Sequence, residues 1–158
     1  MGDLILILGN EPELLRLAMS INQRYCNNKG TIIMYNDLDF HEHIGNYSRV
    51  FLLGHANAQS IGDYDYSSLT KGEFRSLLAN QSVNSIFLAG CSTADETQQI
   101  LKDGFLPLNL AQNLAKFYTG AQVYGTPGVL VRKADGSLNV IPPPLAAGYP
   151  PGTIFVHA

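Results

Sequence analysis

Short apolar segments alternate along this chain with stretches of helical spacing, a pattern typical of a parallel α/β sheet. Leu4–Leu8 is apolar on both faces, as a central parallel strand must be, because helices cover both sides of such a sheet. Further strands are predicted at Thr31–Tyr35, Arg49–Leu53, Ser85–Ala89 and Gln122–Gly125. The pattern therefore predicts an α/β fold with a mostly parallel sheet.

The segment after the first strand has apolar residues at helical spacing: Leu14, Ala18, Ile21 and Tyr25. A capping box, Asn10 with Glu13, is predicted to open this helix. Later helix starts are predicted at Thr70 with Glu73, at Ser92 or Thr93 with Glu96, and at Pro107, the last helix ending near Gly120. A polar loop, Asn57–Ser68, precedes the second of these helices.

The last part of the chain has a different character. Val129–Arg132 and Leu138–Ile141 flank Asp135-Gly136, which predicts a C-terminal β-hairpin. Residues 142–158 form a Pro-rich tail in which Thr153–Val156 is a candidate edge strand. Without an internal linker or repeat, residues 1–158 are interpreted as a single domain.

Composition and charge narrow the possible partners. Hydrophobic residues make up 46% of the 158 residues and charged residues 15%, which suits a buried core and argues against disorder. The net charge is −3 and the ten Lys and Arg are scattered, which argues against nucleic acid, polyphosphate or an anionic membrane as partner. No apolar run approaches the roughly 18 residues of a membrane helix, so a soluble protein is expected.

The start of the chain does not resemble a signal peptide, because its apolar stretch is short and Asp3 precedes it. Cys26 and Cys91 form neither a disulfide framework nor a CxxC metal motif. We therefore expect a reducing setting, either the cytoplasm or a host cell reached through a specialised secretion system.

Two segments of similar pattern carry the candidate chemistry: Val50–His55 and Ile86–Cys91. Each is a predicted buried strand followed by Gly and then by a reactive side chain, His55 or Cys91. The helix between them suits a crossover to an adjacent parallel strand. Both side chains would then emerge at the carboxyl edge of the sheet, where α/β proteins bind their ligands.

An imidazole beside a thiol favours the thiolate, which is the nucleophile. His55 would also protonate the leaving amine, and the backbone N–H groups of Ala56 and Cys91 would form an oxyanion hole. Taken alone, a cysteine at a strand end is more often a buried small hydrophobe and a loop histidine more often a solvated residue. The matched pair after similar strands is what favours a cysteine peptidase.

These residues resemble a known family. The order of apolar strand, Gly54-His55, helix, apolar strand and Gly90-Cys91-Ser92 is similar to that of the clan CD cysteine peptidases, which have the caspase-haemoglobinase fold. Within that clan the chain most resembles the self-processing cysteine protease domains of bacterial toxins and the CHAT peptidases. The segments Ser68–Phe74 and Leu110–Leu114 also resemble helix starts of those domains.

The resemblance implies a three-layer α/β/α sandwich, a Cys-His dyad without metal or cofactor, and cleavage of peptide or protein substrates after one preferred side chain. By position, loops containing Asn10, Glu11 and Thr126 would form the substrate pocket, and Asp63 with Glu11 would suit a basic side chain. Inositol hexakisphosphate activates the toxin domains through a dense basic patch. This chain has no obvious equivalent, so no such site is expected.

The chain departs from the family pattern at Ala56, where glycine is usual after the catalytic histidine, and a caspase-type Gln-Ala-Cys run is absent. An inactive caspase-like binding module and a thiol-dependent acyl transferase or deamidase therefore stay open. Three other readings are weaker. A phosphatase loop would need Arg where Thr97 stands, an amidotransferase would need His157, and His41-Glu42-His43 lacks a third metal ligand. Cys26 is expected to be structural.

Overall fold

The computed structural model describes residues 2–35, 45–91, 93–94, 108–141 and 153–158. Within them lies a six-stranded sheet that is parallel except for β10 at one edge. Its strands, in order across the sheet, are β10 (Val156–His157), β7 (Gln122–Gly125), β6 (Ser85–Ala89), β3 (Tyr47–Leu53), β1 (Gly2–Ile7) and β2 (Thr31–Met34). The predicted α/β class and mostly parallel sheet are confirmed.

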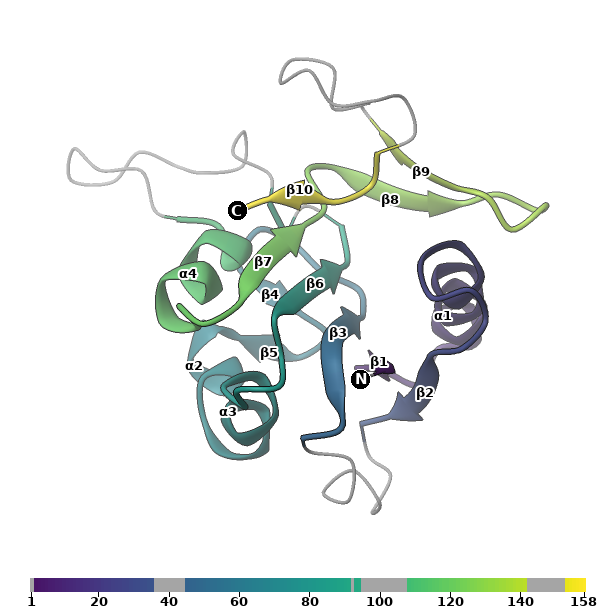
Figure 1. The fold of residues 1–158 in the computed structure, drawn as a ribbon. Helices are drawn as coiled ribbons and strands as arrows, with labels where there is room; N and C mark the ends of the chain where they lie inside the picture. The colour runs from purple at the N-terminus through teal and green to yellow at the C-terminus, as the bar shows by residue number, and fades with distance from the viewer. Residues whose placement is uncertain (1, 36–44, 92, 95–107, 142–152) are drawn as a thin grey trace.

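Helices cover both faces of this sheet, as Figure 1 shows. One face carries α1 (Pro12–Tyr25) and a hairpin of β8 (Val129–Arg132) and β9 (Leu138–Ile141). The other carries α2 (Tyr66–Leu69), α3 (Gly72–Leu78) and α4 (Leu110–Phe117). The three-layer arrangement and the predicted hairpin are therefore present.

The alternation of side chains along the central strands explains their apolar character on both sides. Leu4, Leu6, Val50, Leu52, Ile86 and Leu88 pack in the layer with α2, α3 and α4. Ile5, Ile7, Phe51, Leu53 and Ala89 pack in the layer with α1 and β9. Each strand thus contributes to two hydrophobic cores, which fixes its register against one-residue slippage.

Three helix starts differ from the predicted ones. α1 begins at Pro12 and its N-cap, Glu11, makes no side-chain capping bond, so the predicted capping box at Asn10 is wrong. α3 begins at Gly72, and the Thr70 hydroxyl instead donates to main-chain carbonyls of α2. α4 begins at Leu110 after a capping box formed by Asn109 and Gln112, rather than at Pro107, which lies outside the described residues.

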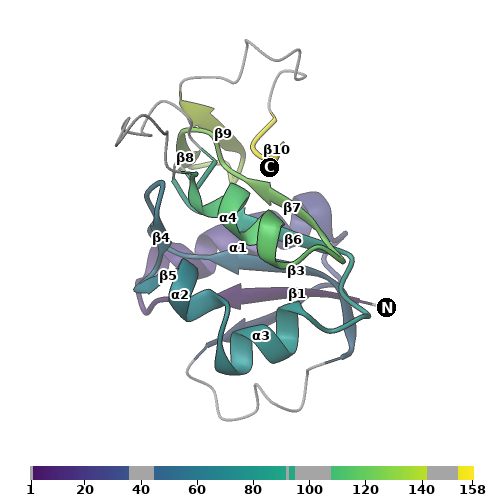
Figure 2. The ribbon, with the colours of Figure 1, turned by 90° about the vertical axis from the view of Figure 1, so that its left-hand side faces the viewer.

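The segment predicted as a polar loop contains a small hairpin. β4 (Ser60–Ile61) and β5 (Tyr64–Asp65) pair antiparallel, and the Asp65 carboxylate caps α2 by accepting from the Ser68 N–H. Gly62, in the turn, has a left-handed φ of +59°, and a Cβ there would lie 2.5 Å from the Leu8 carbonyl oxygen. The hairpin therefore packs against the carboxyl end of β1, at the edge toward which the arrowheads of β1 and β3 point in Figure 2.

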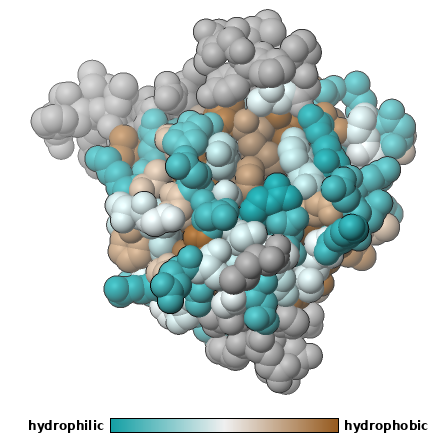
Figure 3. Space-filling model, in the orientation of Figure 1, coloured by the Kyte–Doolittle hydropathy of each residue, from teal (hydrophilic) through white to brown (hydrophobic). Residues whose placement is uncertain are grey.

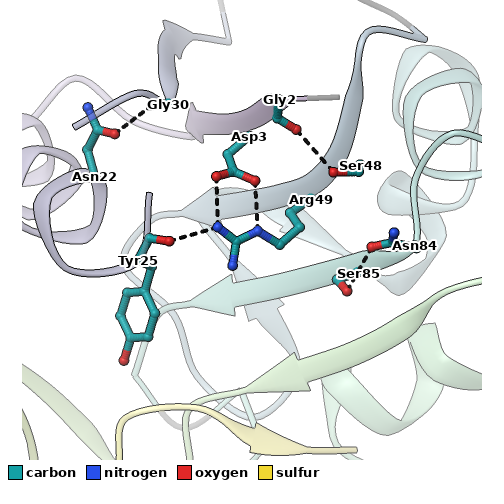
Figure 4. A network of polar contacts seen from close by, with 9 residues as sticks. All are labelled: Gly2, Asp3, Asn22, Tyr25, Gly30, Ser48, Arg49, Asn84 and Ser85. Atoms are coloured by element: carbon teal, nitrogen blue, oxygen red, sulfur yellow. Dashed lines mark hydrogen bonds and ion pairs between the residues drawn. The ribbon is translucent and has the colours of Figure 1, made fainter. Parts of the chain in front are cut away.

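The opposite edge is held by an ion pair. The Arg49 guanidinium donates two hydrogen bonds of 2.7 Å to the Asp3 carboxylate and a third to the Tyr25 carbonyl oxygen (Figure 4). Hydrogen bonding to Arg49 lowers the pKa of Asp3. This pair ties β1 and β3 to the end of α1.

The surface seen in Figure 3 is largely hydrophilic, with hydrophobic areas between the polar side chains. Leu15, Met19, Tyr66, Phe117, Val129 and Ile141 are the large apolar side chains most exposed among the described residues. None of the helices in the described part of the chain is long and apolar enough to cross a membrane.

Candidate active site

His55 and Cys91 follow neighbouring strands at the same edge of the sheet. β3 and β6 pair in parallel, and their last paired residues are Leu53 and Ala89. One glycine follows each of these residues, and then His55 or Cys91. The expectation that the two strands are adjacent and end in register is confirmed, so both side chains belong to the carboxyl edge.

The two segments approach so closely that glycine is needed between them. A Cβ on Gly90 would lie 2.5 Å from the Ala56 side chain and 2.7 Å from the Gly54 carbonyl oxygen. Real Cβ atoms do not approach other atoms so closely, and a backbone oxygen cannot move aside cheaply. The glycine before Cys91 therefore lets the loop after β3 lie against the end of β6.

The loop that carries His55 is fixed by pairing with the β4 segment. Ala56 forms an antiparallel bridge with Ile61, flanked by hydrogen bonds from Gly62 N–H to the His55 carbonyl and from Asn57 N–H to the Ser60 carbonyl. In such a pair the enclosed residues direct their N–H groups away from the partner strand. The Ala56 N–H therefore points away from the hairpin.

Alanine at this position needs no strained backbone. Among the described residues, the non-glycine residues with left-handed φ are Asn27 and Asn28, and Ala56 is not one of them. The backbone at this position therefore adopts an ordinary conformation with alanine.

The turn that carries Cys91 is held from the other side by two buried threonines. The Thr93 hydroxyl donates to the carbonyls of Leu88 and Gly90, and it accepts a 2.9 Å bond from the Thr126 N–H. The Thr126 hydroxyl also donates to the Leu88 carbonyl. The Thr93 hydroxyl thus fastens the turn after β6 to the end of β7. Ser92 and residues 95–107, where a helix opened by Ser92 or Thr93 is predicted, lie outside the described residues.

The His55 ring is exposed, and its Nε2 lies 3.3 Å from the Glu13 carboxylate in the first turn of α1. Cys91 is partly exposed. The Cys91 thiol and the His55 ring, both among the described residues, share no hydrogen bond. The ring contacts Glu13 instead. Sequence reasoning missed Glu13 as a site residue by assigning it to a capping box. Its place just beyond β1, the neighbour of β3, was the available signal.

The residues predicted for the substrate pocket differ in their exposure to solvent. Asn10, Glu11 and Asp63 are exposed, and they follow β1 or lie in the β4–β5 turn at the same edge as His55. Thr126 also lies at this edge, after β7, but it is fully buried and its hydroxyl is bonded to Leu88. Its position suits a structural role behind Cys91 rather than contact with a substrate.

The second cysteine has a very different environment. Cys26 is buried beside the Asp3–Arg49 pair, at the edge of the sheet opposite Cys91. Burial, followed by the charge of Asp3 and a hydrogen bond to it, raises the pKa of the Cys26 thiol to about 12. Near neutral pH this thiol stays protonated and unreactive.

The other sequence candidates do not join the site. His157 contacts Gln122 at the start of β7, on the edge opposite Cys91. It therefore cannot act on Cys91 as the histidine of an amidotransferase would. Thr97 and His41-Glu42-His43 lie outside the described residues. In the described ranges, no group of three His, Cys, Asp or Glu is arranged to hold a metal ion.

A cavity of about 470 Å³ lies between the ends of α3 and α4 and is lined in part by Arg75, Phe117 and Tyr118. Because this region precedes β6 and β7, it is at the amino edge of the sheet, away from Cys91. It brings no candidate nucleophile or base together.

Comparison with known proteins adds no relative: no family model matches the chain, and no curated protein matches it significantly. The function is therefore inferred from the residues at the carboxyl edge.

Proposed function

We propose that this protein is a cysteine endopeptidase in which Cys91 is the nucleophile and His55 the general acid and base. The observation that carries the proposal is the register of β3 and β6, which end together one glycine before each of these residues. The resemblance of the same segments to clan CD peptidases supports it, including the self-processing toxin or effector domains.

The first half of the reaction forms an acyl-enzyme. The Cys91 thiol gives its proton to His55, and the resulting thiolate attacks the carbonyl carbon of the scissile peptide bond. The negative oxygen that develops is stabilised by the N–H groups of Ala56 and Cys91. When the C–N bond breaks, the His55 imidazolium returns its proton to the leaving amine.

The second half restores the enzyme. His55, now neutral, takes a proton from water as the resulting hydroxide adds to the thioester carbonyl. Collapse of this intermediate releases the carboxylic acid product and the Cys91 sulfur, which recovers its proton from His55. Exposed Glu11 and Asp63 at this edge suit a substrate with a basic side chain.

A positional-scanning peptide library, incubated with the parent and with Cys91→Ala, tests the proposal. Cys91→Ala should reduce cleavage to background, and His55→Ala should lower kcat by about 10²–10⁴-fold. Cys26→Ala is the matched control, because Cys26 is buried at the opposite edge, and it should cleave like the parent. Cleavage by Cys91→Ala at the parent's rate would refute the proposal.

A non-catalytic binding module is the second candidate, and the orientation of the His55 ring toward Glu13 rather than the thiol favours it. In that case His55→Ala should leave the alkylation rate of Cys91 unchanged. Deamidation or another acyl transfer would use the same residues. Mass spectrometry of a model protein would then show a small mass change without chain scission.

A further inference from the structure

The Glu13 carboxylate is placed at the edge of the sheet by the way α1 begins. β1 and β3 are neighbours that end together, Ile7 pairing with Leu53, so the helix after β1 starts beside the segment after β3. Pro12 occupies the first position of α1, and Leu14 is buried in the core beneath the helix. Glu13, between them, is held on the exposed side of a fixed first turn.

This position brings the carboxylate to one nitrogen of the catalytic histidine. Glu13 Oε1 and His55 Nε2 are 3.3 Å apart, and both side chains are more than half exposed. Other ionisable groups at this edge are Glu11 from the start of α1, Asp63 from the β4–β5 turn, and Cys91 after β6. Among the described carboxylates, that of Glu13 contacts the His55 ring.

We propose that Glu13 is a positioning residue for His55, an inference that rests on the peptidase function proposed above. A carboxylate can only accept a hydrogen bond, so it selects the ring form with the proton on Nε2. Nδ1 is then the nitrogen that takes the Cys91 proton. The Glu13 carboxylate stabilises the imidazolium that forms, which favours proton transfer from the Cys91 thiol to His55.

The rate of Cys91 alkylation by iodoacetamide measures this effect without any peptide substrate. Near pH 7, Glu13→Gln should slow alkylation by about 1.5- to 5-fold, the range expected for one exposed ion pair. At about pH 10, where ordinary thiols ionise unaided, the two rates should converge. A merely structural effect of the substitution on access to the thiol would persist at both pH values.

Glu73→Gln is the matched control. Glu73 is the second residue of α3, as Glu13 is of α1, so the substitution removes the same charge from the same helical position. It should leave Cys91 alkylation at the parent's rate. Mapping the alkylated peptide by mass spectrometry separates Cys91 from Cys26, which stays protonated in its buried site.

The outcomes distinguish this inference from the proposed function. If His55→Ala slows alkylation and Glu13→Gln slows it less but measurably at pH 7 alone, the positioning role stands. If His55→Ala slows alkylation while Glu13→Gln matches the parent, the positioning role is overturned and the dyad remains. If His55→Ala has no effect, the dyad fails and Glu13 has nothing to position.

Discussion

Substitution of Thr93 should strongly lower the stability of the fold near the site, because its polar side chain is completely buried. It is fully buried, and its hydroxyl both donates to the carbonyls of Leu88 and Gly90 and accepts from the Thr126 N–H. Thr93→Val keeps the shape of the side chain but removes both functions. The variant therefore isolates the polar contribution of this hydroxyl from its packing.

The expected loss follows from the bonds that disappear. The donated hydrogen bond contributes about 1 kcal/mol, and a buried N–H left without an acceptor costs about 1–3 kcal/mol more. Thr93→Val should therefore lower the free energy of unfolding by about 2–4 kcal/mol. For a chain of this size, each kcal/mol lowers Tm by about 2–4 °C. Urea titration followed by circular dichroism measures the difference directly.

Thr70→Val provides the control. Thr70 is also buried and donates to two main-chain carbonyls, of Tyr66 at 2.8 Å and Ser67 at 3.3 Å. No N–H of the described chain donates to its hydroxyl, so this variant should lose only about 1 kcal/mol. If Thr93→Val is no less stable than Thr70→Val, the Thr93 hydroxyl does not hold the Cys91 turn.

Two further predictions concern the close approach at the site and the opposite edge of the sheet. Gly90→Ala should lower the free energy of unfolding by about 1–3 kcal/mol, because its Cβ would collide with Ala56. Gly120→Ala is the control and should be tolerated, because its Cβ would meet nothing within 4 Å. Equal stabilities of the two variants in urea titration would contradict this prediction. Because Arg49 holds the folded-state pKa of Asp3 below its ordinary 3.8, the pair stabilises the fold above that pH and loses this contribution as the pH falls through the folded-state value. Asp3→Asn should therefore be less stable than the parent by about 1 kcal/mol at pH 6. Parallel thermal melts should show this difference in stability narrowing toward pH 2. A difference that does not change with pH would argue against the ion pair.

The strands were predictable because their burial leaves a simple signal. A strand covered on both faces is apolar at successive positions, as residues 4–7 of β1 and 50–53 of β3 are. The predicted strands Ser85–Ala89 and Gln122–Gly125 coincide with β6 and β7. The adjacency of β3 and β6 then followed from the length of the crossover between them. This much of the candidate site is contained in the local pattern of residues.

The helix starts were harder to predict because polar side chains have several possible partners. Asn10 and Glu13 have the spacing of a capping box, but the Glu13 carboxylate faces His55 instead. The Thr70 hydroxyl likewise bonds to carbonyls of α2 rather than opening α3. These choices depend on which segments the tertiary fold brings together, which spacing along one segment does not specify.

The backbone on either side of the proposed dyad is fixed by separate devices. The β4 segment pairs with the loop of His55, while Thr93 and Thr126 hold the turn of Cys91. Both sets of bonds are made without any contribution from the imidazole or the thiol. The proposed dyad therefore places its two reactive side chains on backbone segments that are held independently of them. An edge built in this way retains its geometry when either reactive side chain is replaced, so loss of activity in those variants would report chemistry rather than unfolding.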